Sequence, residues 1–123
     1  RPKSLQGQSL IPILKDSDEK GRGWALTQVT RGGANDSRFF GYSIRTERFR
    51  YTEWDGGGKG RELYDHHNDP SEKANLAEDP KFEKDLAMLS ELLHQAISST
   101  FPVDGETPKL KPGLWAPNLT DVD

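Results

Sequence analysis

The sequence predicts an α+β domain in which a small antiparallel sheet of about four strands packs against one helix near the C-terminus. Residues 39–54, FFGYSIRTERFRYTEW, are rich in the aromatic and β-branched side chains that favour strands. Residues 80–99 instead repeat apolar side chains at helical spacing. Glycine-containing segments at 31–38 and 55–60 separate the aromatic region from two further short stretches of strand-like composition.

Residues 39–54 are predicted to form two strands of a hairpin. The turn is expected at Thr46 and Glu47, between two runs in which aromatic side chains alternate with polar ones. The predicted outer strands are residues 23–30 (GWALTQVT) and residues 61–65 (RELYD), because both alternate in polarity and hold strand-forming residues.

Residues 80–99 are predicted to be helical. Asp79 suits the N-cap, and Pro80 suits the first helical position. Glu83 and Asp85 place negative charge near the positive end of the helix dipole. The apolar residues that share one face of this helix are Phe82, Leu86, Leu89, Leu93 and Ala96.

Three regions are expected along the chain. Residues 1–22 are predicted to be a linker with one short helical turn, near Ser9 and Pro12. Residues 23–100 are predicted to form the domain itself, and residues 101–123, with four prolines, an extended tail. The apolar residues of that tail are expected to lie on a neighbouring surface: Leu110, Leu114 and Trp115.

The composition suggests a domain that packs on something larger. Hydrophobic residues make up only 32% of the chain, and the mean hydropathy is −0.87. That is little apolar surface for a self-sufficient core, since small domains bury a smaller fraction of their surface than large ones.

The net charge of −3 includes no basic block, so nucleic acid is not an expected partner. No apolar run is long enough for a membrane span, and no cysteine is present.

The adjacent residues His66 and His67, with carboxylates around them, raise the question of a metal site. Neighbouring side chains on an extended segment point in opposite directions, so these two histidines do not easily share one metal. The sequence around Asn68, Asp69 and Pro70 is typical of a turn that ends a strand. We therefore expect turn histidines and no metal ligand in this chain.

A search for catalytic motifs finds none that is complete. No G-x-S-x-G nucleophile elbow occurs. The glycine run at 56–60 lacks the spacing of a phosphate-binding loop, because Lys59 is followed by glycine and a strand rather than by Ser or Thr and a helix.

Arg31 and Arg38 are the binding candidates, because they bracket a glycine-rich loop beside the strongest strand. Two guanidinium groups at a loop mouth suit an anion. The alternative is that they pair with surface carboxylates or pack on aromatic rings. Asn35, in the same loop, opens an Asn-x-Ser sequon and is the third candidate.

Four segments follow one another in a distinctive order: LQGQSLIPIL, ALTQVTR, FFGYSIRTERFRYTEW and GRELYDHHNDPSEKANLA. This order resembles the C-terminal part of sulfatases of the alkaline phosphatase superfamily, and most of all the iduronate-2-sulfatase-like branch. The block GYSIRT…RYTEW is specific to that branch, whereas ELYD…DP-x-E-x-x-N-L is shared by many sulfatases. The resemblance extends from about residue 5 to residue 97.

The resemblance implies a small C-terminal subdomain that docks on a larger α/β sulfatase catalytic domain or heavy chain. The family's nucleophile is a formylglycine made in a Cys/Ser-x-Pro-x-Arg motif, and this chain lacks that motif. Formylglycine and calcium are therefore expected elsewhere in the enzyme, with no catalytic and no metal-binding residue here. Arg38, Arg31 and Asn35 are expected to contact a sulfated sugar, with Arg31 partly buried. The family implies a periplasmic, secreted or lysosomal location.

Two competing functions stay open at this point. One is a phosphonate or phosphodiester hydrolase of the same superfamily, which the nucleophile motif of the complete enzyme would separate from a sulfatase. The other is a stand-alone, non-catalytic carbohydrate-binding module, which would behave as a sugar-binding monomer in gel filtration.

Overall fold

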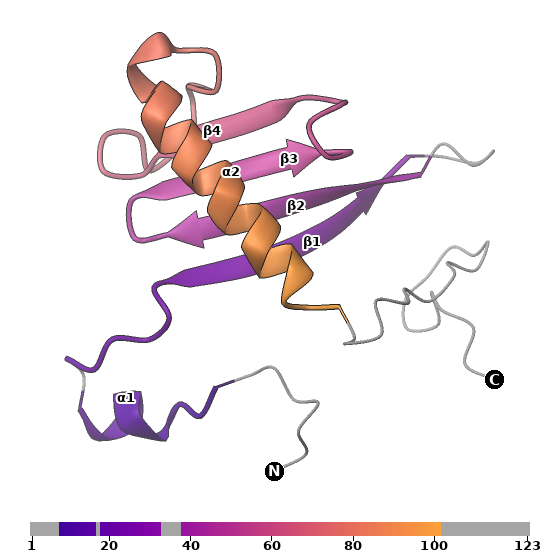
Figure 1. The fold of residues 1–123 in the computed structure, drawn as a ribbon. Helices are drawn as coiled ribbons and strands as arrows, with labels where there is room; N and C mark the ends of the chain where they lie inside the picture. Colours follow the sequence, from indigo (N-terminus) through magenta and orange to yellow (C-terminus); the bar gives the residue numbers. More distant parts are fainter. Residues whose placement is uncertain (1–7, 17, 33–37, 102–123) are drawn as a thin grey trace, which may run out of the picture.

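The computed structural model describes residues 8–16, 18–32 and 38–101 (Figure 1). Its elements in chain order are α1 (Ile11–Lys15), β1 (Trp24–Arg31), β2 (Phe39–Thr46), β3 (Phe49–Trp54), β4 (Arg61–Asp65), the 3₁₀ turn η1 (Pro80–Phe82) and α2 (Glu83–Ser98). The predicted α+β class is confirmed, with a four-stranded antiparallel sheet and a helix that follows it. Most of the predicted tail, residues 102–123, lies outside the described residues.

The sheet is an antiparallel meander, with strand order β1-β2-β3-β4. Ile44 of β2 pairs with Leu26 of β1 and with Tyr51 of β3, and Tyr51 pairs in turn with Leu63 of β4. One apolar row therefore crosses all four strands on the same face. The turn between β2 and β3 is closed by Thr46, whose hydroxyl oxygen accepts a hydrogen bond from the backbone N–H of Phe49 at 3.0 Å.

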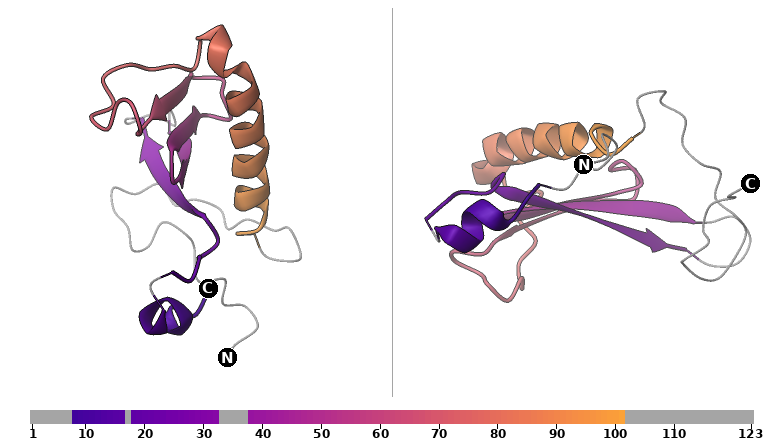
Figure 2. Two further views of the ribbon diagram at one scale, coloured as in Figure 1. Left: turned by 90° about the vertical axis from the view of Figure 1, so that its left-hand side faces the viewer. Right: turned by 90° about the horizontal axis from the view of Figure 1, so that it is seen from below.

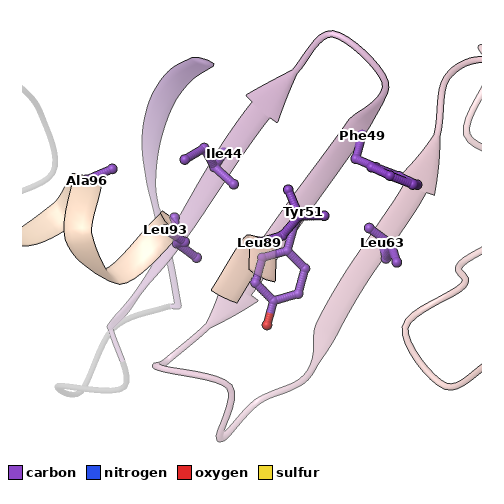
Figure 3. Close-up of a cluster of buried hydrophobic side chains, with 7 residues drawn as sticks. All are labelled: Ile44, Phe49, Tyr51, Leu63, Leu89, Leu93 and Ala96. Carbon is purple, nitrogen blue, oxygen red and sulfur yellow. The ribbon is translucent and has the colours of Figure 1, made fainter. Parts of the chain in front are cut away.

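Helix α2 lies across this face and completes the core (Figure 2). Leu89 and Leu93, both fully buried, point from the helix toward Ile44 and Tyr51 of the sheet (Figure 3). Burying a Leu or Ile side chain contributes roughly 1.5–3 kcal/mol. The complete core is Ile44, Phe49, Tyr51, Leu63, Leu89, Leu93 and Ala96.

The start of α2 follows from local capping. The Asp79 carboxylate accepts a hydrogen bond from the backbone N–H of Lys81 at 3.0 Å, and Pro80 occupies the first position of the 3₁₀ turn, as expected. Glu83 and Asp85 lie in the first turn of the α-helix. The predicted helix of residues 80–99 thus consists of a 3₁₀ turn and the α-helix that continues it.

The segment between β4 and η1 covers the outer edge of β4. The Asn75 side-chain oxygen accepts from the N–H of Leu63 at 2.9 Å, and its amide donates to the carbonyl of Arg61 at 3.0 Å. The N–H of Leu76 donates to the carbonyl of Leu63 at 2.8 Å. These bonds satisfy backbone groups that an edge strand otherwise leaves unpaired.

The other face of the sheet, called here the helix-free face, carries Arg31, Phe39, Arg45, Arg50 and Trp54. They alternate with the core residues in the strand register, and the segment after β4 loops out on this side (Figure 2, left). In the part of the chain that the structure describes, no helix has the length and apolar character to cross a membrane.

Candidate functional site

Arg31, the first predicted binding residue, ends β1 on the helix-free face. It pairs with Phe39 in the sheet register, and its guanidinium carbon lies 4.6 Å from the ring centroid of Trp54. The side chain is exposed, so the expectation that it is partly buried is wrong. Stacking on an aromatic ring holds a guanidinium in position while its N–H groups stay available to a ligand.

Arg38, the second predicted residue, immediately precedes β2 and is half-buried. The antiparallel pairing of β1 and β2 therefore brings Arg31 and Arg38 to the same end of the sheet, on the two sides of the connecting loop. Asn35 lies outside the described residues. The structure thus brings two of the three candidates together. Which of them contacts a ligand stays a prediction.

His66 takes part in a polar network on the helix-free face that the sequence did not predict. Its Nδ1 accepts from the Arg45 guanidinium at 2.9 Å, and its Nε2 lies 2.5 Å from a carboxylate oxygen of Glu72. Glu72 also forms an ion pair with Arg50. Arginine can only donate hydrogen bonds, so Nδ1 is the accepting nitrogen of the ring. In the neutral ring the proton then sits on Nε2, which donates to Glu72.

The same surroundings favour the neutral ring. Burial lowers the pKa of His66, and the charges of Arg45 and Arg50 lower it further. Among the residues that the structure describes, no group of three or more His, Cys, Asp or Glu side chains is arranged to hold a metal ion. The role of His66 is therefore structural: through its contacts with Arg45 of β2 and Glu72, it ties the segment after β4 to the sheet.

Asp65 organises the turn that follows β4. Its carboxylate accepts two hydrogen bonds from Arg48, at 3.0 and 2.7 Å, one from the Asn68 side chain at 2.8 Å and one from the backbone of His67 at 3.1 Å. The hydrogen bonds from Arg48 are the main reason that the pKa of Asp65 lies far below its ordinary value. This confirms the interpretation of the DHHND segment as a turn.

Glu53 is a second buried carboxylate, and it links the sheet to α2. One carboxylate oxygen accepts from the Tyr51 hydroxyl at 2.7 Å and the Ser90 hydroxyl at 2.8 Å, and the other lies 2.8 Å from Nε2 of His94. Burial raises the pKa of Glu53, but these hydrogen bonds outweigh that effect and bring it below its ordinary value. Burial and the bond to Glu53 raise the pKa of Tyr51 to about 12.

The sequence contains an indication of this network. Glu53 lies two residues after Tyr51, so on a strand its carboxylate is on the same apolar face as the Tyr51 ring. An open hollow of about 890 Å³ runs along the flank of α2 beside it and is lined by Arg61, Ser90 and His94 among others. Arg31 and Arg38, the two predicted binding residues that the structure describes, do not line this hollow. The hollow is therefore lined by other residues than these two arginines.

The antiparallel meander closed by one helix matches the C-terminal subdomain of sulfatases. Two solved structures share the fold over 81% of this chain. One, assigned to the sulfatases, comes from Bacteroides thetaiotaomicron VPI-5482, with a TM-score of 0.67 and 32% identity. The other, BT4656 in complex with its substrate D-glucosamine-2-N,6-O-disulfate, has a TM-score of 0.70 and 26% identity.

The chain belongs to the family described as N-sulphoglucosamine sulphohydrolase, C-terminal, whose model matches residues 1–99. A curated relative from Bacteroides thetaiotaomicron, a Delta 4,5-hexuronate-2-O-sulfatase, is 45% identical over 97 residues, which is 79% of this chain. The chain spans 20% of that relative and 21% of each of the two solved structures. The predicted resemblance to sulfatase C-terminal domains is confirmed.

Proposed function

We propose that this domain is the C-terminal part of a sulfuric ester hydrolase acting on sulfated sugars, and that it forms one wall of the substrate pocket. The observation that carries the proposal is the 45% identity to a hexuronate-2-O-sulfatase over 97 residues. The finer proposal is an iduronate-2-sulfatase-like activity, in which the sulfate is removed from position 2 of a uronate within a glycosaminoglycan or a related polysaccharide.

The loop between β1 and β2 is proposed as the part of the wall that contacts the sugar. Gly32 begins it with a φ of +108°, a conformation that side chains disfavour, and glycine also lets backbone approach a ligand closely. Arg31 and Arg38 bracket the loop, and Asn35 lies within it. Arginine suits sulfate and carboxylate groups because its planar fork donates two parallel hydrogen bonds.

The remainder of the enzyme is proposed to supply the catalytic groups. A formylglycine would provide the nucleophile for sulfur, and calcium would neutralise charge on the sulfate. The described residues offer no metal-binding group of their own, so this domain is not proposed to hold the calcium. The partner is then a larger sulfatase catalytic domain or heavy chain, and the proposed location is the periplasm, the extracellular space or the lysosome.

The role of the loop is tested with Arg38→Ala in the complete enzyme. We expect the KM for a 2-O-sulfated unsaturated uronate disaccharide to rise about tenfold, the effect of roughly 1.4 kcal/mol. Turnover of 4-nitrophenyl sulfate should stay unchanged, because that substrate has no second anionic group. Arg22→Ala is the control, since Arg22 is an arginine near the opposite end of the sheet, just before β1, where its guanidinium carbon lies 4.3 Å from the centroid of Trp24.

An unchanged KM for Arg38→Ala would mean that the loop is not part of the substrate pocket.

A separate experiment tests the enzyme class. The complete enzyme should release sulfate from the disaccharide, and the 123-residue chain alone should not. Hydrolysis of a phosphonate monoester without hydrolysis of any sulfate ester would favour the competing superfamily function. Sugar binding by a stable, monomeric 123-residue chain would favour a stand-alone carbohydrate-binding module.

A further inference from the structure

An aromatic pair lies at the loop end of the helix-free face. The rings of Phe39, which begins β2, and Trp54, which ends β3, meet edge to face, with centroids 6.3 Å apart and an interplanar angle of 83°. Trp54 lies against Gly41, where a Cβ atom would fall 2.3 Å from the indole ring. Only glycine at that position lets the indole reach the strand, so the place of the ring is fixed by β2.

Two cations lie over this aromatic pair, one from the end of β1 and one from the turn between β3 and β4. The guanidinium carbon of Arg31 is 4.6 Å from the Trp54 centroid, at the start of the β1–β2 loop. The Nζ of Lys59, in the turn between β3 and β4, is 5.1 Å from the Phe39 centroid. Both distances are in the range of cation–π attraction.

Arg31 and Lys59 differ from Arg48 and Arg50 in forming no ion pair with a carboxylate of the described residues. Arg48 pairs with Asp65, and Arg50 pairs with Glu72. Within the described part of the chain, neither Arg31 nor Lys59 lies within ion-pair distance of an acidic group. Both side chains are exposed. The rings therefore position two positive charges without neutralising them.

The turn that carries Lys59 is held tightly. The N–H of Lys59 donates to the carbonyl of Trp54 at 3.0 Å, and the N–H of Trp54 donates to the carbonyl of Gly60 at 3.0 Å. Asp55 is fixed to β2, because its N–H donates to the carbonyl of Phe40 at 2.8 Å. Positive φ angles, including +90° at Gly57, make glycine the suitable residue for this path. Lys59 is thus placed on a rigid support.

We propose that Arg31 and Lys59 together form a binding surface for a second anionic group of the sugar substrate, a sulfate or a carboxylate. The guanidinium offers paired donors and the ammonium a compact point charge, a combination that suits a group with several negative oxygens. Phe39 and Trp54 are the positioning residues. This inference rests on the proposed function and extends the substrate contact from the β1–β2 loop to the β3–β4 turn.

The test compares Lys59→Ala with wild type in the complete enzyme. We expect about a tenfold rise in KM for the 2-O-sulfated unsaturated disaccharide, with kcat unchanged and with no effect on 4-nitrophenyl sulfate. Lys84→Ala, an exposed lysine on α2, is the matched control and should change neither constant. Because Lys59 is exposed, its loss should not unfold the protein, and the thermal midpoint of the variant checks this.

The two sources of the anionic group are separated by substrate. A rise in KM for a 2-O-sulfated uronate disaccharide without any further sulfate assigns the surface to the carboxylate, and a rise only for a disaccharide with a further sulfate assigns it to that sulfate. Trp54→Leu should raise the same KM by releasing Arg31, and Trp54→Phe should restore it in part. An active wild type whose KM is unaffected by Lys59→Ala overturns this inference alone. A wild type that hydrolyses no sulfate ester overturns the proposed function with it.

Discussion

The two faces of the sheet are built on different principles. The face under α2 is apolar, and its two buried carboxylates are enclosed in hydrogen bonds: Glu53 by Tyr51, Ser90 and His94, and Asp65 mainly by Arg48. The helix-free face is polar, with the His66 network near β4 and the Arg31–Lys59 surface at the loop end. The face under α2 therefore stabilises the fold, whereas the helix-free face exposes charged side chains to solvent or to a ligand.

The sharpest contrast between the faces should come from apolar truncation. Leu89→Ala removes a fully buried side chain under α2, and we expect it to lower the free energy of unfolding of this chain by about 2–5 kcal/mol. Val29→Ala, on the helix-free face and 43% exposed, should cost less than about 1 kcal/mol. Urea denaturation of both variants measures the difference. Equal losses would mean that the two faces contribute alike.

Substitution of carboxylates should give the next largest contrast. Glu53→Leu leaves the hydroxyls of Tyr51 and Ser90 without their acceptor, which should cost about 1–3 kcal/mol. Glu62→Leu, on the helix-free face of β4, should cost much less, because Glu62 is only half-buried.

The Glu53 effect should also depend on pH. Folding lowers the pKa of Glu53 from about 4.5, so its contribution is complete above that pH and is lost as the pH falls below it. Urea midpoints between pH 3 and pH 7 should therefore fall less steeply for Glu53→Leu than for wild type. Parallel curves would contradict the role assigned to this carboxylate.

The smallest expected effect separates the two adjacent histidines. His66→Gln should lower stability by about 1 kcal/mol through lost hydrogen bonds to Arg45 and Glu72, whereas His67→Gln, at an exposed position, should be nearly silent. The pKa of His66 is lowered from 6.5 in the folded chain, so its contribution is complete above that pH and is lost as the pH falls. Thermal midpoints between pH 5 and pH 8 measure it, and identical profiles for the two variants would contradict the network.

The elements of the fold could be predicted from the sequence because local patterns specify them. The aromatic and β-branched residues of 39–54 predicted two strands, and helical spacing placed Leu89 and Leu93 on the apolar face of the helix, where both are buried in the core. The turn after β4 was predicted because Asn, Asp and Pro cluster there.

The contacts between elements could not be predicted in the same way. His66 meets Glu72 and Arg45 only because the segment after β4 folds back onto the helix-free face, and no spacing rule encodes that return. Arg31 was expected to be partly buried because it follows a predicted strand at a place where the resembling family also has an arginine. In the structure its strand is the edge of the sheet, and the side chain lies on Trp54, a residue distant in sequence. Long-range stacking of this kind leaves no periodic signal.

The sequential order of the strands has a consequence for how the chain acquires its structure. Each strand pairs only with its neighbours in the sequence, and β2 and β3 are joined by residues 47–48 alone. Closing such short loops costs little chain entropy, and folds with local contacts reach their native state quickly. The sheet can therefore form by successive hairpins, with α2 docking last. A rapid, locally driven assembly suits the role proposed for this domain, a surface on which a larger catalytic domain packs.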